Sequence, residues 1–381
     1  MEFRSLPKTK YVKIRFILTF ALATAVLYTI VSDISFLPIF SRADIRINAS
    51  YRNKSYHTFR IWTESDKNNR TKWRYTASKN FTKTLYSEQE LSKFPFLAEK
   101  VINPHNYKHV ISPSVTCKDQ QEIEIIICVS TRFDNFASRQ TIRETWGSYA
   151  NVSSHNSILI FFIGQRNNSA PNASLTQKSF LYESVMYGDI LQEDYLDCYN
   201  NLTLKSVSIL KYVSIHCFKR AKYILKADDD MYINVPYLVT SLKQLQAKKP
   251  NLDAFVMGIK HTKPNPNRST DSKWYISISE FPEDNYPDYV SGGAYVMSTQ
   301  AAWLLYQASL RLPLFRWEDV YITGMCSKKA GVEVLDSELF SYSKYSVSGC
   351  SFRERISGHP YSPDELRQIH SELNNRTLVC T

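Results

Sequence analysis

The pattern of apolar residues changes near residue 119, after which short apolar runs alternate with segments of helical spacing. "EIEIIICVST" (122–131) and "ILIFFIG" (158–164) are continuous apolar runs, typical of strands buried on both faces of a parallel sheet. "KYILKA" (222–227) predicts a third strand of this kind. "KWYIS" (273–277) predicts an aromatic-rich strand, which would line a ligand site or pack in the core.

Two helical segments lie between these strands. "SRQTIRETWG" (138–147) predicts a short helix with basic residues on one side and an aromatic residue at its end. The segment 201–221 predicts an amphipathic helix. Its apolar residues at helical spacing are Leu204, Val207, Leu210 and Val213. Alternating strands and helices predict an α/β fold with a mostly parallel sheet, in which ligands bind beyond the carboxyl ends of the strands.

The N-terminal segment has the pattern of a membrane anchor. "FILTFALATAVLYTIV" (16–31) carries no charge and is preceded by four basic residues within residues 8–15. With the next residues it approaches the ~20 that a membrane-spanning helix needs. We therefore predict a cytosolic tail over 1–15, a signal-anchor over 16–33 and a lumenal remainder. A cleaved signal peptide is the alternative, although the small residues lie in mid-run and no clear cleavage site follows.

Residues 34–118 predict a lumenal stem, because they are rich in Lys, Arg, Asn, Ser, Thr and Tyr and show no sustained periodicity. A small independent domain is the alternative. Residues 119–381 are then the catalytic domain. Ten N-x-[S/T] sequons follow the anchor, in agreement with a lumenal location. They begin at Asn48, Asn53, Asn69, Asn80, Asn151, Asn167, Asn172, Asn201, Asn267 and Asn375.

All seven cysteines also follow the anchor. In an oxidising lumen most of them should form disulfides, and the odd number leaves at least one unpaired. The spacing does not determine which residues pair. Cys128 lies inside an apolar run and is our candidate for a free thiol in the core. The chain contains no C-x-x-C, which argues against a zinc cluster.

The net charge of +11 suggests a nucleic-acid partner until its location is considered. The excess lies in residues 1–115, whereas residues 116–381 carry twenty-eight basic and twenty-eight acidic residues. A nucleic-acid-binding domain should carry a basic patch of its own. The distribution therefore argues against nucleic acid as a partner.

"KADDDMYIN" (226–234) places three carboxylates directly after a predicted strand. Adjacent carboxylates repel one another unless a cation neutralises them, and Mg²⁺ or Mn²⁺ commonly bridges carboxylates to substrate phosphates. In an extended segment, Asp228 and Asp230 would face one site and Asp229 would face elsewhere, toward a sugar hydroxyl. The alternative is an acidic turn or helix cap without a ligand.

A second candidate lies in "RWEDVYITGMC" (316–326), where Glu318 and Asp319 follow Trp317. An acid beside an aromatic residue can be desolvated, which raises its pKa toward that of a useful base. The alternative is that both carboxylates only stabilise the first turn of a helix. "YPDYVSGGAYVMS" (286–298) contains paired glycines that would let the backbone approach a flat ligand or form a simple turn.

Seven motifs in order resemble those of the β-1,3-glycosyltransferases, glycosyltransferase family 31, which includes β-1,3-galactosyltransferases and β-1,3-N-acetylglucosaminyltransferases. They are "RQTIRETWG", "FFIG", "ESVMYGDILQEDYLDCYNNLTLK", "KADDDMYIN", "KWYIS", "YPDYVSGGAYVMS" and "EDVYITG". The resemblance covers residues 123–365. It implies a GT-A fold, a UDP-sugar donor, Mn²⁺, inversion at the anomeric carbon and a type II location in the Golgi membrane.

The resemblance also implies roles for individual residues. Asp228 and Asp230 would hold Mn²⁺, with His359 completing the site, and Asp319 would be the catalytic base. The resemblance further implies that a set of residues contacts the UDP-sugar or lines the sugar and acceptor region. They are Arg139, Arg143, Trp146, Lys205, Asp228, Asp229, Trp274, Tyr289 and Gly293. Salt-bridged scaffold roles are an equal alternative for Arg143 and Lys205.

Two positions depart from the pattern. Cys198 stands where relatives often carry Thr or Ser, which leaves disulfide pairing open. Gly293-Ala294 stands where many relatives have a small residue and then Gly, which leaves the donor sugar open. The resemblance thus predicts transfer of galactose, or otherwise N-acetylglucosamine or N-acetylgalactosamine, to a glycan on glycoprotein or glycolipid. The alternative is an inactive type II membrane glycoprotein that binds carbohydrate.

Overall fold

The computed structural model describes residues 92–117, 122–166, 173–375 and 377–380. The predicted cytosolic tail, the signal-anchor and most of the predicted stem lie outside the described residues. Within them, no helix combines the length and the apolar character needed to cross a membrane. The prediction of an anchor therefore remains a prediction from sequence.

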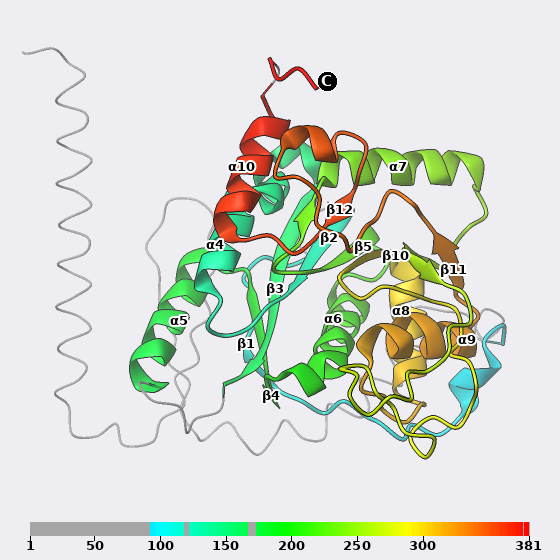
Figure 1. Cartoon of the computed structure of the whole chain (residues 1–381). Coiled ribbons are helices and arrows are strands. Elements are labelled where there is room, and N and C mark those ends of the chain that lie inside the picture. The colour runs from blue at the N-terminus through cyan, green and yellow to red at the C-terminus, as the bar shows by residue number, and fades with distance from the viewer. Residues whose placement is uncertain (1–91, 118–121, 167–172, 376, 381) are drawn as a thin grey trace, which may run out of the picture. The chain divides into compact units, whose positions relative to one another are not determined.

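An eight-stranded sheet forms the centre of the fold (Figure 1), in the order β1-β4-β3-β2-β5-β10-β7-β11. The β1–β4, β5–β10 and β10–β7 pairs are antiparallel and the other neighbours are parallel. In chain order the strands are β1 (His109–Ile111), β2 (Ile123–Ser130), β3 (Ser157–Gln165), β4 (Ile190–Leu196), β5 (Ala221–Asp228), β7 (Phe255–Gly258), β10 (Ala294–Ser298) and β11 (Glu333–Asp336). The predicted α/β fold with a mostly parallel sheet is confirmed as a mixed, mainly parallel sheet.

Helices and two small sheets complete the described part of the chain. The longer helices are α4 (Phe136–Glu144), α5 (Ala173–Tyr187), α6 (Leu202–His216), α7 (Val235–Lys248), α8 (Thr299–Ser309) and α10 (Pro363–Leu373). A π-helix, η6 (Val320–Cys326), leads into the short α9 (Ser327–Ala330). The small sheets pair β6 (Tyr232–Ile233) with β12 (Ser357–Gly358), and β8 (Lys260–His261) with β9 (Tyr289–Val290). Short 3₁₀ helices are η2 (Pro95–Ala98), η3 (Trp146–Asn151), η4 (Ser153–His155), η5 (Tyr199–Asn201) and η7 (Gly349–Phe352).

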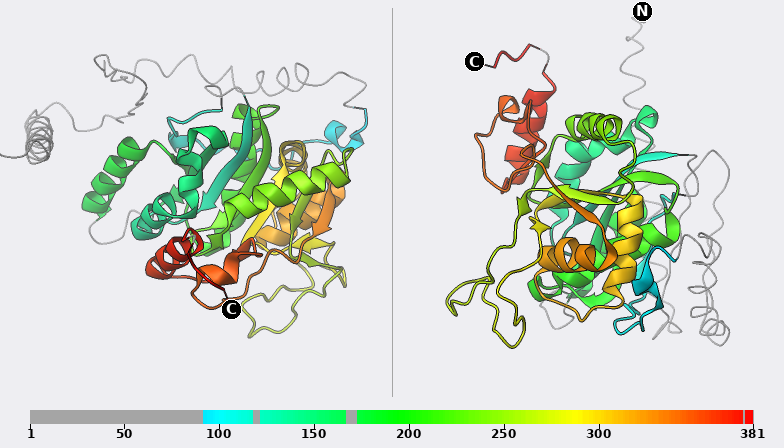
Figure 2. Two further views of the ribbon diagram at one scale, coloured as in Figure 1. Left: turned by 90° about the horizontal axis from the view of Figure 1, so that it is seen from above. Right: turned by 90° about the vertical axis from the view of Figure 1, so that its right-hand side faces the viewer.

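The central strands are buried on both faces, which is why their sequences are continuous apolar runs. Side chains alternate between the faces of a strand, so Ile125 and Ile127 enter one core and Ile126 and Cys128 the other. Helices α6 and α8 cover the second core, and α4, α7 and α10 cover the first (Figures 1 and 2). The apolar face predicted for α6 is confirmed, because all four of its residues are buried.

One predicted strand is wrong. Residues 273–277 form a loop, with only an isolated bridge between Asn267 and Tyr275. The segment lies between β8 and β9, and the strand positions beside β7 are already taken by β10 and β11. Its aromatic residues are therefore not a sheet face: Trp274 is 60% exposed while Ile276 is buried.

Part of the segment 92–117, which the sequence predicts to belong to the stem, contacts the sheet and the core. Strand β1 pairs with β4 at the edge of the sheet, and Phe96 is buried in the core beside α8. A disulfide from Cys117 to Cys217 fastens this segment to the end of α6. Strand β1 has three residues and only partial burial, a pattern too weak to read from sequence, and the boundary at residue 119 stays a prediction.

Four of the seven cysteines form disulfides, Cys117–Cys217 and Cys350–Cys380. Cys128 is free and buried, as predicted, and burial raises the pKa of its thiol. Cys198 and Cys326 are also unpaired.

Replacing Cys117 with serine should lower the free energy of unfolding by about 3–5 kcal/mol, because the Cys117–Cys217 bond closes a loop with a sequence separation of 100. Thermal unfolding monitored by circular dichroism without reductant measures the effect. The control is Cys198→Ser, which removes a thiol that forms no disulfide and should change stability by less than about 0.5 kcal/mol. Equal stability of the two variants would contradict the assigned pairing.

Candidate active site

The three adjacent carboxylates lie at the carboxyl end of β5, in the middle of the sheet. Asp228 is the last residue of the strand, and the chain turns at Asp229 and Asp230 before β6. The predicted extended geometry is therefore wrong beyond Asp228. The turn still separates the side chains: Asp229 points away, where its Oδ2 accepts hydrogen bonds from Thr131 Oγ1 and, at 2.8 Å, from Asn135 Nδ2.

Asp230 lies beside His359, 129 positions later in the chain. The antiparallel β6–β12 pair joins the two segments, and Tyr361 N donates to the Asp230 carbonyl at 2.9 Å. His359 Nε2 is 3.9 Å from Asp230 Oδ2, and both side chains are partly exposed. Burial, with the neighbouring charge of Asp228, raises the pKa of Asp230. The structure thus brings together the two residues that the resemblance placed at one metal site.

The donor set fits a hard divalent cation. His359 Nδ1 is 3.0 Å from the Tyr342 carbonyl oxygen, which can only accept, so in the neutral ring the proton sits on Nδ1 and the Nε2 lone pair faces Asp230. Such a backbone contact orients many metal-binding histidines. Ligands of one such ion lie roughly 3–4 Å apart, given bond lengths of about 2.0–2.2 Å.

Among the described residues, no group of three His, Cys, Asp or Glu side chains forms a ready metal cage. Ions of the Mg²⁺ or Mn²⁺ type commonly keep several waters and bind through one or two carboxylates together with substrate phosphates, and Mn²⁺ at this turn stays a prediction.

Asp319 lies at the start of η6, against the glycine pair that follows β9. Its Oδ1 accepts from Val320 N at 2.9 Å. Burial raises the pKa of Asp319. A Cβ atom at Gly292 would lie 3.3 Å from Asp319 Cβ and 3.1 Å from Glu318 Oε2, so the missing side chain permits this close approach. Asp319 is partly buried, with the glycine turn as its neighbour, and its role as a base stays a prediction.

The glycine turn (Gly292 and Gly293) contacts both Asp319 and the segment of Asp228, Asp229 and Asp230, which we call the carboxylate turn. Gly293 O accepts a 2.9 Å hydrogen bond from Asp228 N, while Gly292 packs on Asp319. The backbone of Asp228 and the side chain of Asp319 therefore contact the same pair of glycines. The glycine turn thus links the segment of the candidate cation site to the segment of the candidate base.

Three stacked rings lie between the segment of Asp319 and the segment of His359. The His261 ring stacks on Tyr289 at 4.8 Å between centroids and on Tyr342 at 6.4 Å. Tyr289 is close enough to Asp319 for that carboxylate to add to the burial that raises the tyrosine pKa. Tyr342 carries the carbonyl that holds His359. Sequence analysis missed His261 and Tyr342, because neither lies in a motif and only the fold brings them together.

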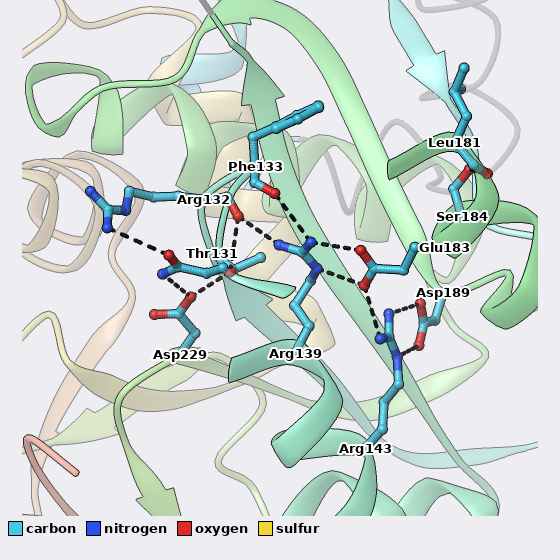
Figure 3. A network of polar contacts seen from close by, with 11 residues as sticks. Thr131, Arg132, Phe133, Arg139, Arg143, Leu181, Glu183, Ser184, Asp189 and Asp229 are labelled. Atoms are coloured by element: carbon cyan, nitrogen blue, oxygen red, sulfur yellow. Dashed lines mark hydrogen bonds and ion pairs between the residues drawn. The ribbon is translucent and has the colours of Figure 1, made fainter. Parts of the chain in front are cut away.

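Arg139 and Arg143 point into buried ion pairs and away from the carboxylate turn (Figure 3). Arg139 binds Glu183 at 2.6 Å and the carbonyl of Arg132 at 2.6 Å. Arg143 binds Asp189 at 2.7 Å and also Glu183 at 2.9 Å. Both guanidinium groups are thus occupied, which favours the scaffold interpretation over contact with the donor.

The other donor-side candidates divide between core and surface. Lys205 is buried and donates to the Thr131 carbonyl at 2.5 Å and to Asp197 at 2.9 Å, so it supports the residue that holds Asp229. Trp146 is buried in the core. Trp274 lies exposed in the 262–288 loop. Direct contact of these side chains with a donor remains a prediction.

Replacing Arg139 with methionine should cost about 3–5 kcal/mol of unfolding free energy, since it leaves Glu183 with one buried partner fewer. Binding of UDP, measured by calorimetry at a temperature where the variant is folded, should stay within about twofold of the parent. The control Arg367→Met breaks an exposed pair with Glu144 and should cost under about 1 kcal/mol. UDP binding weakened tenfold in the folded Arg139 variant would instead support donor contact.

Comparisons with known proteins show which family the sequence resembles. The family profile described as galactosyltransferase matches residues 137–338. β-1,3-Galactosyltransferase 1 of Mus musculus is 32% identical over 302 residues, which cover 79% of this chain and 89% of that protein. β-1,3-Galactosyltransferase 2 of Homo sapiens is 30% identical over 282 residues, covering 73% and 65%.

Two solved structures are similar at low scores. A glycosyltransferase involved in glycosylation of the major capsid of PBCV-1 has 12% identity and a TM-score of 0.34, covering 65% of this chain and 99% of that one. The galactosyltransferase LgtC, with donor and acceptor sugar analogues, has 9% identity and a TM-score of 0.32, covering 66% and 96%. At these scores the likeness carries no argument about this chain.

Proposed function

The chain belongs to the galactosyltransferase family and is a glycosyltransferase, and from this premise we propose that it is an inverting β-1,3-galactosyltransferase. Its donor is UDP-galactose and its acceptor is a glycan on glycoprotein or glycolipid. N-acetylglucosamine and N-acetylgalactosamine are the other candidate sugars. The observation that carries the proposal is the desolvated Asp319 carboxylate beside the glycine turn that also binds Asp228.

The carboxylate turn has the role of holding the donor diphosphate. Asp228, Asp230 and His359 would hold Mn²⁺. When bound, this ion supplies Lewis-acid stabilisation of the departing diphosphate. Asp229 keeps the turn in place through Thr131 and Asn135, so its role is to orient its neighbours. A GT-A type of fold, which the resemblance implied, is part of this proposal.

Asp319 has the role of general base. Val320 N donates to its Oδ1, and a backbone hydrogen bond from Gly292 also engages the carboxylate. This carboxylate takes the proton from the acceptor hydroxyl. As that proton leaves, the acceptor oxygen forms its bond to the anomeric carbon and the bond from this carbon to the UDP oxygen breaks. A single displacement from the opposite face, without a covalent intermediate, inverts the configuration. The raised pKa of Asp319 makes it a stronger base than an exposed aspartate.

The location proposed for the enzyme is the Golgi membrane, with a single type II anchor over 16–33 and the catalytic domain in the lumen. The support is the apolar run, the basic residues before it, the sequons and the two disulfides. Sensitivity of the glycans to endoglycosidase and protection of the domain from protease in intact vesicles would test it. Protease-accessible, unglycosylated protein would contradict this topology.

The donor is tested with the full chain in detergent micelles and UDP-galactose, UDP-N-acetylglucosamine and UDP-N-acetylgalactosamine, each with and without Mn²⁺. Release of UDP reports donor use, because such enzymes can pass the sugar slowly to water. We expect Mn²⁺-dependent turnover that is fastest with UDP-galactose. Failure with all three donors, where a β-1,3-galactosyltransferase from the same preparation is active, would favour the carbohydrate-binding alternative.

A further inference from the structure

A buried lysine lies two positions before Asp228 and is not used in the proposed mechanism. Lys226 is only 3% exposed, and its ammonium contacts three groups. Its Nζ is 2.6 Å from Asp228 Oδ1, 2.5 Å from the Gly292 carbonyl oxygen and 3.9 Å from Glu318 Oε2. Burying a charge this deeply costs desolvation free energy unless the charge is paired, so these contacts hold the ammonium in one position.

These three groups belong to three separate segments of the chain. Asp228 ends β5, Gly292 lies in the turn between β9 and β10, and Glu318 precedes η6. Tyr295 secures the third segment further, since its hydroxyl donates to Glu318 Oε1 at 2.7 Å. Tyr295 is the residue paired with Lys226 in the antiparallel β5–β10 pair. The ammonium is therefore a common attachment point for the segments that carry both candidate functional carboxylates.

The contact with Asp228 also selects one of its oxygens. Lys226 occupies Oδ1, which leaves Oδ2 for a cation. On the other side, Glu318 is the residue immediately before Asp319, so a shift of Glu318 moves the backbone of the candidate base. Because an error of about 1 Å in the placement of reacting groups can cost about 10²-fold in rate, the fixed spacing of these segments has a kinetic consequence.

We propose that Lys226 is a positioning residue for sugar transfer, whose ammonium fixes the Asp228 carboxylate and the segment of Asp319 relative to each other. This inference rests on the proposed function. It differs from a purely structural role, in which Lys226 would only neutralise the buried Glu318. In the structural role, removing the charges of Lys226 and Glu318 together would restore a normal site, whereas a positioning role would leave Asp228 unanchored.

The test uses the full chain carrying Lys226→Met, the double change Lys226→Met/Glu318→Gln, and Lys211→Met as the matched control. The double variant removes the uncompensated carboxylate and so protects the fold. Lys211 on α6 forms a comparable ion pair, at 2.7 Å, with Glu193. Glu193 belongs to β4, which lies toward the other edge of the sheet. Three quantities are measured: the melting temperature, Mn²⁺ affinity by electron paramagnetic resonance, and kcat and KM for UDP-galactose.

We expect Lys226→Met to lower kcat by about 10²-fold and Mn²⁺ affinity at least fivefold. The double variant, whose fold is restored, should show the same two losses. Lys211→Met should lower the melting temperature but leave both functional quantities within about twofold. A folded double variant with parental kcat and Mn²⁺ affinity would overturn the proposal. If the parent shows no turnover, the proposed function fails, but the Mn²⁺ affinities still test whether Lys226 positions Asp228.

Discussion

Replacing Asp319 with asparagine lowers the transfer rate by about 10²–10⁴-fold, the range expected when a general base is removed. Asparagine has almost the same shape and can still accept the bond from Val320 N, but it cannot take a proton. Binding of UDP should therefore remain within about twofold while kcat falls. The measurement is steady-state transfer to a glycan acceptor with UDP-galactose, alongside calorimetric UDP binding.

The pH dependence provides a second readout of this variant. Burial raises the pKa of Asp319, and the base acts only when ionised. Transfer should therefore decline as the pH falls through a value above the ordinary ~3.9 of aspartate, and this decline should be absent from residual activity of Asp319→Asn. Asp253→Asn, an exposed carboxylate shortly before β7, is the control and should change neither rate nor profile. A rate for Asp319→Asn within about fivefold of the parent would assign the base elsewhere.

Replacing Asp230 with alanine has the second large expected effect, at least a 10–100-fold loss of Mn²⁺ affinity with a matching loss of turnover. Its carboxylate lies 3.9 Å from His359 Nε2, so the change removes one of the three proposed ligands, which are Asp228, Asp230 and His359. His359→Ala should weaken Mn²⁺ by about tenfold. Electron paramagnetic resonance measures the bound ion directly.

The control for the metal variants is Asp364→Ala, an exposed carboxylate at the start of α10, which should leave Mn²⁺ affinity unchanged. Parental Mn²⁺ affinity in both Asp230→Ala and His359→Ala would contradict the assignment of the site. The turn at β5 would then be an acidic cap without a ligand.

The central sheet could be predicted because its strands are buried on both faces. In β2, β3 and β5 alternate residues enter the two cores, so each strand is a continuous apolar run. The location of these strands in the sequence can therefore be predicted from the apolar runs. The same reasoning fails for residues 273–277, whose aromatic residues lie in a loop. Local composition resembles a strand there, but no neighbouring strand is available to pair with it.

The candidate site could be predicted only as separate pieces. The carboxylate turn and Asp319 carry a chemical signature in the sequence, whereas Lys226 looks like an ordinary strand residue until its three partners are known. His261 and Tyr342 stack across the site although 81 positions separate them. Arg139 and Arg143 carry the charge expected of a phosphate contact, but Glu183 and Asp189, more than 40 positions later, occupy them. Such pairings depend on tertiary structure, which no local pattern specifies.

The most direct test of the account is the structure of the transfer product. The full chain is incubated with UDP-galactose, Mn²⁺ and an acceptor selected from a glycan array, and nuclear magnetic resonance then determines the new linkage and anomeric configuration. We predict galactose in β linkage to the 3-hydroxyl, formed by the parent and not by Asp319→Asn. An α-linked product would contradict inversion by a single base at Asp319, and absence of any product with every acceptor would contradict transfer itself.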